Sequence, residues 1–182
     1  MAQYTIAVVV GSLRKDSFNN KLATALEKLF PADFSFTHVR IDDLPLYNQD
    51  DDSKQCVQVT RLKGEIAAAK AVLFVTPEYN RSIPGVLKNA IDHASRPYGQ
   101  SAWTGKPAGI IGASPGPLGT AMAQQHLRNI LVSQNMPTLS QPEAFIHNKE
   151  GLYDAAGNIG EASRKFLQGW VDAYVAWVKK HT

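Results

Sequence analysis

Residues 4–10 read YTIAVVV and run directly into GSLRKDSFNN (11–20), and this junction decides the fold. The first stretch is short, β-branched and apolar without alternation. Such a pattern is typical of a parallel strand whose two faces are both covered by helices. Comparable or weaker strand patterns occupy residues 33–40, 71–76, 108–113 and 138–145.

Apolar residues recur at helical spacing between these strands. Leu87, Ala90, Ile91 and Ala94 fall on one helical face. The same spacing appears in residues 22–29 and 123–131, and an aromatic stripe of core type runs through Phe166, Trp170, Ala173, Tyr174 and Trp177. Strand and helix therefore alternate, which predicts one α/β domain over 1–182: a doubly wound, five-stranded parallel sheet with helices on both faces.

Composition excludes several classes of protein. The 182 residues carry 19 Lys and Arg against 16 Asp and Glu, a net charge of +3, without a dense basic patch. We therefore expect no binding to nucleic acid or to a membrane. Cys56 is the single cysteine and the histidines lack ligand spacing, so we expect no metal site. The apolar runs are too short to span a membrane and no secretion signal is visible, which favours the cytoplasm.

Ligands of such sheets bind outside the carboxyl ends of the strands. The loop that follows residues 4–10 offers short polar side chains at Ser12, Ser17 and Asn19 and a charged fork at Arg14. Behind them begins a helix with free N–H groups, so the loop is suited to a phosphate dianion. The alternative is a plain helix cap at Ser17. The dinucleotide motif G-x-G-x-x-G is absent here.

Two further loops end at the same edge. Residues 77–85 (PEYNRSIPG) carry an aromatic ring, an amide and a carboxylate, which suits a planar heterocycle, although an ordinary loop with a buried Tyr79 is the alternative. Residues 112–119 (GASPGPLG) let a ligand approach the backbone closely. Gly112–Gly116 also matches G-x-S-x-G, the nucleophile elbow of serine hydrolases, with Ser114 as nucleophile. Pro115 weakens that alternative because it has no N–H for an oxyanion hole.

The three loops together resemble the NAD(P)H-dependent FMN reductase family, and within it the bacterial quinone and chromate reductases. The matching segments are GSLRKDSFNN (11–20), TPEYNRSIPGVLKNAIDHAS (76–95), GKPAGIIGASPG (105–116) and QHLRNIL (125–131). The resemblance implies a flavodoxin-like fold with strand order 2-1-3-4-5 and FMN at the switch point. Members of this group often carry tyrosine where this chain has Arg81.

The resemblance also implies the site residues. Ser12, Arg14, Ser17, Phe18 and Asn19 would hold the FMN phosphate, Glu78 to Arg81 would line the ring and ribityl chain, and Ser114 would contact the flavin. The full cofactor set is Ser12, Leu13, Arg14, Lys15, Asp16, Ser17, Phe18, Asn19, Pro77, Glu78, Tyr79, Asn80, Arg81, Ser114 and Gly116. No catalytic side chain is expected, because the flavin carries the chemistry.

The implied activity is an oxidoreductase with NAD(P)H as co-substrate. It would pass two electrons by a ping-pong mechanism to a small-molecule acceptor: a quinone, a flavin, chromate or an azo compound. The chain would also self-associate as a homodimer or homotetramer. The alternative is a flavodoxin-type electron carrier. Such carriers usually present an acidic docking face and a Thr-Gly phosphate loop, whereas this chain has a net charge of +3 and lacks that loop.

Overall fold

The computed structural model describes residues 3–182, and its strands form one parallel sheet in the order β2-β1-β3-β4-β5. The strands are β1 (Tyr4–Val10), β2 (Phe34–His38), β3 (Ala71–Val75), β4 (Ala108–Ser114) and β5 (Phe145–His147). This order confirms the flavodoxin-like arrangement. The expected bounds of the first four strands are met to within two residues at either end.

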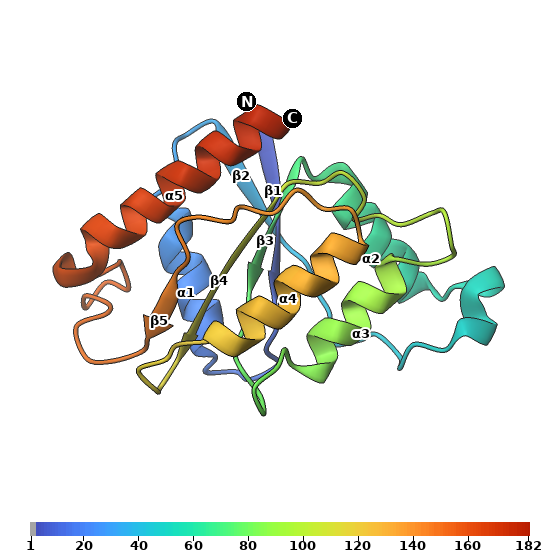
Figure 1. The fold of residues 1–182 in the computed structure, drawn as a ribbon, viewed down its shortest axis with the longest axis horizontal. Helices are drawn as coiled ribbons and strands as arrows, with labels where there is room; N and C mark the ends of the chain where they lie inside the picture. The colour runs from blue at the N-terminus through green and yellow to red at the C-terminus, as the bar shows by residue number, and fades with distance from the viewer. Residues whose placement is uncertain (1–2) are drawn as a thin grey trace.

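Helices cover both faces of the sheet (Figure 1). They are α1 (Phe18–Glu27), α2 (Val57–Ala68), α3 (Gly85–Ala94), α4 (Ala121–Ser133) and α5 (Glu161–His181), with a short 3₁₀ helix, η1, at Gln49–Lys54. α1 and α5 pack on one face, and α2, α3 and α4 on the other. None of the helices within residues 3–182 is both long enough and apolar enough to cross a membrane.

The uninterrupted apolar run of β1 supplies both halves of the core. Ile6 and Val8 face the core under α1 and α5, whereas Ala7 and Val9 face the core under α2, α3 and α4. All four are fully buried. Each larger side chain buried in this way stabilises the fold by about 1.5–3 kcal/mol, so β1 is fixed from both sides.

The long helix α5 confirms most of the expected aromatic stripe. Trp170 and Tyr174 are fully buried, with their ring centroids 5.6 Å apart. A Cβ on Gly109 of β4 would lie 2.8 Å from the ring of Tyr174, so this glycine allows α5 to approach the sheet. The expectation was wrong for Phe166, whose side chain is half exposed, because Leu167 occupies the inward position on that turn.

The fifth strand also differs from its expected position at 138–145. Thr138 makes only an isolated bridge to Ala108, and the strand itself is β5, which begins at Phe145. Pro142 lies between them and has no N–H to donate to a ladder, so a continuous strand cannot form there.

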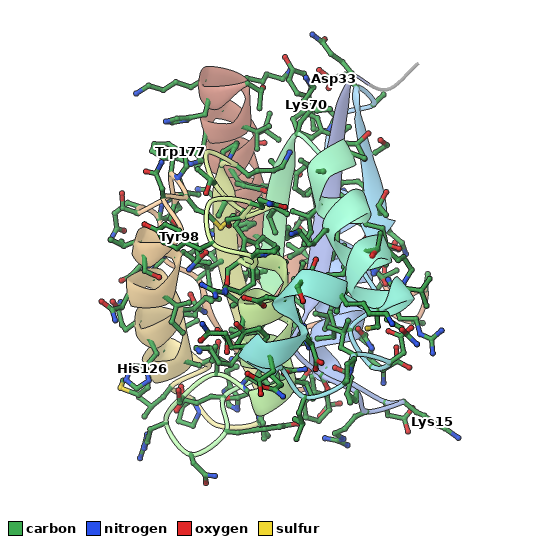
Figure 2. The ribbon with its side chains drawn as sticks, turned by 90° about the vertical axis from the view of Figure 1, so that its right-hand side faces the viewer. Lys15, Asp33, Lys70, Tyr98, His126 and Trp177 are labelled. Atoms are coloured by element: carbon green, nitrogen blue, oxygen red, sulfur yellow. The ribbon has the colours of Figure 1, made fainter. Side chains whose placement is uncertain are left out.

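The parallel strands place the loops after β1, β3 and β4 at one end of the molecule. Figure 2 shows Lys15 and His126 at this end, with Asp33, Lys70 and Trp177 toward the opposite end. β1 begins and α5 ends near that opposite end (Figure 1).

Candidate functional site

The loop after β1 turns tightly because Gly11 is pressed against the neighbouring loop. Its N–H donates to the carbonyl oxygen of Val75 at 3.0 Å. A Cβ on Gly11 would lie 3.3 Å from both Thr76 and Pro77, closer than side chains normally approach. The loops that follow β1 and β3 are therefore in direct contact.

Ser17 begins α1 as its N-cap. Its hydroxyl oxygen accepts the N–H of Asn20 at 3.2 Å, so the helix-cap alternative is confirmed for this residue. The cap leaves the N–H groups of Phe18 and Asn19 without an acceptor among residues 3–182. They form the positive end of the helix dipole and can bind an anion. Capping and anion binding are thus compatible at α1.

The side chain of Arg14 lies beside this anion site. Its guanidinium carbon lies 5.5 Å from the centroid of the Phe18 ring, a cation–π arrangement that places positive charge beside the first turn of α1. Leu13, Lys15 and Asp16 on the same loop are exposed. This donor set, two free N–H groups with an arginine beside them, fits the phosphate of FMN.

The side chain of Asn19 has a structural task that the sequence did not indicate. It is buried, its Nδ2 donates to the carbonyl oxygen of Ala113 at 3.0 Å, and its Oδ1 accepts the Ala113 N–H at 2.9 Å. Both amide atoms are therefore used to join α1 to β4. Only the main-chain N–H of Asn19 remains for a phosphate.

The loop after β3 contains a two-residue hairpin turn. The N–H groups of Tyr79 and Ser82 each donate to the other's carbonyl oxygen at 3.0 Å, while Asn80 and Arg81 have φ of 52° and 67°. Left-handed conformation at both central residues defines a type I′ turn. Tyr79 is half exposed, so the alternative of an ordinary loop around a buried tyrosine is wrong.

Glu78 connects this loop to α4. Its Oε2 accepts the N–H groups of Met122 at 2.9 Å and Ala123 at 3.1 Å, whereas Thr120 gives the helix no side-chain cap. A carboxylate at this position also stabilises the positive end of the helix dipole. The oxygen Oε1 of Glu78 remains outside these bonds. Pro84 precedes α3 as its N-cap.

Ser114 follows β4 and is not arranged as a nucleophile. Its hydroxyl donates to the carbonyl oxygen of Gly119 at 2.5 Å and lies 3.2 Å from that of Gly116. His126 instead contacts the Ser82 hydroxyl at 3.0 Å, and within residues 3–182 Ser114 hydrogen-bonds to no histidine. The serine hydrolase alternative therefore lacks its general base.

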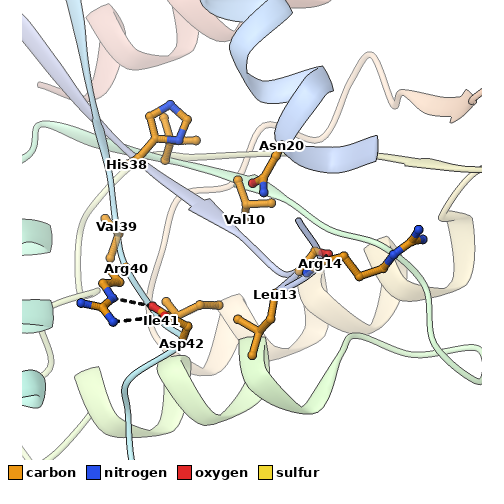
Figure 3. Close-up of a pocket in the computed structure, with 11 residues that line it drawn as sticks. Val10, Leu13, Arg14, Asn20, His38, Val39, Arg40, Ile41 and Asp42 are labelled. Atoms are coloured by element: carbon orange, nitrogen blue, oxygen red, sulfur yellow. Dashed lines mark hydrogen bonds and ion pairs between the residues drawn. The ribbon is translucent and has the colours of Figure 1, made fainter. Parts of the chain in front are cut away.

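The structure thus brings all three expected loops to one end of the sheet and bonds them together. It also adds a neighbouring cavity of about 320 Å³, which the sequence did not indicate (Figure 3). Ser12, Leu13 and Arg14 form one wall, and residues 38–42 form the other. Only the position of residues 33–40 as a strand ending at this edge could have pointed to the second wall.

Charges on the second wall of that cavity are already paired. Arg40 binds Asp42, with Nε 2.6 Å from Oδ1, while the Arg14 side chain points away from this pair (Figure 3). His38 lies 2.5 Å from the Oε1 of Glu27, and this hydrogen bond raises the pKa of His38 above its usual value despite partial burial. Among the described residues that line this cavity, Arg14 is therefore the cationic side chain without an ion pair.

Comparisons with known proteins agree with this geometry. The model of the NADPH-dependent FMN reductase family matches residues 4–151. A 2-hydroxy-1,4-benzoquinone reductase of a Burkholderia species is 56% identical over 96% of each chain. A quinone reductase of Pseudomonas putida is 49% identical over 97% of this chain and 95% of its own.

A solved structure extends the match to three dimensions. The flavoenzyme NAD(P)H:(acceptor) oxidoreductase FerB from Paracoccus denitrificans superposes with a TM-score of 0.94, at 51% identity over 98% of both chains. The family model and this flavoenzyme support bound FMN with NAD(P)H as co-substrate. With the fold, the phosphate-type loop and these matches in agreement, the chain belongs to the NADPH-dependent FMN reductase family.

Proposed function

We propose that this protein is an NAD(P)H-dependent, FMN-containing quinone reductase. The observation that carries the proposal is the start of α1, where Arg14 and two N–H groups that have no acceptor within residues 3–182 form an anion site. The adjoining loop after β3 carries the half-exposed ring of Tyr79. The names of relatives at 49–56% identity support the reaction class.

When bound, FMN supplies the two-electron chemistry, taking a hydride equivalent from NAD(P)H and delivering two electrons to the acceptor. The chain's own residues bind and orient it. Arg14 and the N–H groups of Phe18 and Asn19 hold the phosphate, and the hairpin turn at Tyr79–Ser82 supports the ring. Ser12, Ser17, Ser114 and Gly116 contribute to the same site, together with Leu13, Lys15, Asp16 and residues 77–81.

The acceptor class is a small planar oxidant. Quinones come first because the relatives are named for them, and free flavins, chromate and azo compounds are further acceptors to test. One space serving both NAD(P)H and acceptor gives ping-pong kinetics. Double-reciprocal plots of initial rate against NAD(P)H concentration, measured at several acceptor concentrations, are therefore expected to be parallel lines. Intersecting lines would contradict a shared space.

We propose further that the chain works as a homodimer or homotetramer. Supporting this, a groove of about 730 Å³ beside the phosphate loop is lined by apolar residues that include Leu13, Leu44, Leu46 and Val86. Leu13 is 51% exposed and Leu46 is 87% exposed, and both line this groove. Exposed apolar side chains that are gathered in one patch are typical of an interface between chains. Light scattering of the wild type and of Leu46→Glu tests this.

We place the enzyme in the cytoplasm, where NAD(P)H is available.

The test of the function is an absorption spectrum of the purified protein, taken before and after anaerobic addition of NADPH. One FMN per chain is expected, with the flavin absorbance lost on NADPH addition and regained when a quinone is added. A flavodoxin-type carrier would stay yellow with NADPH alone. A colourless protein that remains colourless after incubation with FMN would contradict the proposal.

A further inference from the structure

Arg81 is held in an unusual backbone conformation at the tip of the loop that follows β3. It has a φ of 67° within a type I′ turn closed by two hydrogen bonds of 3.0 Å between Tyr79 and Ser82. Such a turn favours Asn or Gly at its central residues, and Asn80 meets this preference whereas Arg81 does not. The left-handed region costs a residue with a Cβ about 1–2 kcal/mol. The turn therefore fixes where the arginine stem leaves the backbone.

The guanidinium of Arg81 has little charge compensation within residues 3–182. Its side chain is 72% exposed, and the nearest carboxylate oxygen is Oε1 of Glu78, 3.9 Å from Nη1. The other oxygen of Glu78 is committed to the N–H groups at the start of α4. No hydrogen bond from the guanidinium to a described residue is present, so its planar set of donors is free for a ligand.

An arginine of this kind recognises planar anions with two adjacent oxygens, because its parallel N–H groups bind both at once. A 2-hydroxy-1,4-quinone is such a ligand. It is a vinylogous acid, so at neutral pH it is an anion whose charged oxygen stands next to a ring carbonyl. A neutral quinone has no charge and offers the fork no such pair.

We propose that Arg81 is a specificity-determining residue that binds ionised hydroxyquinones at the rim of the flavin site. The inference rests on the proposed function and names the acceptor class within it. Arg81 takes no part in electron transfer. The overall reaction stays NAD(P)H plus one proton plus quinone giving NAD(P)⁺ plus hydroquinone, and the arginine lowers the KM of the anionic acceptor.

The test compares two acceptors, 2-hydroxy-1,4-naphthoquinone as the anion and 1,4-naphthoquinone as its neutral counterpart. Arg81→Gln removes the charge while keeping a long side chain with the same backbone strain. It is expected to lower kcat/KM for the hydroxyquinone about tenfold, mainly through KM, a size consistent with one exposed charge-assisted interaction. The readout is the ratio of this value to kcat/KM for the neutral quinone, which should fall by about tenfold, because any loss of FMN binding would lower both values alike. Arg81→Lys keeps the positive charge but loses the paired N–H donors of the guanidinium. Its kcat/KM for the hydroxyquinone should therefore lie between those of the wild type and Arg81→Gln.

Lys70→Gln is the matched control, because it removes one exposed positive charge at the opposite end of the molecule (Figure 2). It is expected to leave the ratio of the two acceptors unchanged. A second readout is ionic strength: added salt should raise the KM of the wild type for the anion and have little effect in Arg81→Gln. FMN content of each variant checks that the site is intact.

Two outcomes separate this inference from the proposed function. If Arg81→Gln retains FMN and reduces both quinones with the wild-type ratio, or loses both equally, the role of Arg81 is overturned while the quinone reductase activity stands. If the wild type binds no FMN or reduces neither quinone, the proposed function fails and the inference fails with it.

Discussion

Asn19 and Ala113 are joined by two reciprocal hydrogen bonds of 3.0 and 2.9 Å, between the amide side chain of the first and the backbone of the second. They connect the start of α1 to the end of strand β4 in the interior of the protein. The anion site and the loop after β4 are therefore held at a fixed distance. The same asparagine orients the first turn of α1, where the N–H groups without an acceptor among residues 3–182 form the candidate phosphate site.

Asn19→Ala is expected to lower the free energy of unfolding by about 1–3 kcal/mol, because it leaves the buried N–H and C=O of Ala113 unpaired. FMN binding should weaken as well, since the first turn of α1 loses its anchor. Urea unfolding measures the first effect. The exposed neighbour Asn20→Ala is the control, and equal stability losses in the two variants would contradict the structural role of Asn19.

Gly109→Ala is expected to destabilise the protein by about 1–3 kcal/mol, since the new methyl group would meet the Tyr174 ring at 2.8 Å. Gly169→Ala is the matched control in α5: nothing lies within 4 Å of its added Cβ. Because alanine favours the helix, this second change should stabilise by about 0.5–1 kcal/mol. Thermal unfolding should give a lower Tm for Gly109→Ala and a higher Tm for Gly169→Ala than for the wild type. A Gly109→Ala variant as stable as the wild type would contradict the close packing of α5 against β4.

The His38–Glu27 pair predicts a pH-dependent stability. The hydrogen bond to Glu27 raises the pKa of His38 in the folded state above the unfolded value of about 6.5. Its contribution is therefore fully present below about pH 6.5 and is lost as the pH rises through the folded pKa. The pair is partly exposed, so the effect is about 0.5 kcal/mol or less.

Glu27→Gln tests this pair. The stability difference between wild type and variant should be larger at pH 6 than at pH 9, as measured by urea unfolding. An NMR titration of the His38 ring should give a lower pKa in the variant. A difference that is the same at both pH values would contradict the pair.

The sequence predicts the sheet well for a physical reason. Strands buried on both faces must be apolar throughout, so β1 and β3 stand out as uninterrupted runs between helical repeats. The strand order came from the resemblance to a known family. Within β5 only three residues pair, and such a short strand leaves no pattern that could be distinguished from its proline-containing approach.

The candidate site is predicted less completely than the fold. Residue types such as Arg14 and Ser17 are visible in a sequence, but the partners of a side chain are not. Asn19 bonds to a residue 94 positions away, and Glu78 bonds to main-chain N–H groups that no sequence motif reveals. Both residues remain predicted FMN contacts, and the structure adds that the amide of Asn19 and the Oε2 atom of Glu78 join the loops.

The central claim is that FMN is held through its phosphate at the start of α1, and its most direct test is the binding of FMN and riboflavin to apoprotein of the wild type and of Arg14→Ala. Riboflavin lacks the phosphate and serves as the control ligand. The account predicts that Arg14→Ala weakens FMN binding by about 1.5–3 kcal/mol, the size of a charge-assisted hydrogen bond, and leaves riboflavin binding unchanged. Equal affinities of wild type and variant for FMN, or equal losses for both ligands, would contradict it.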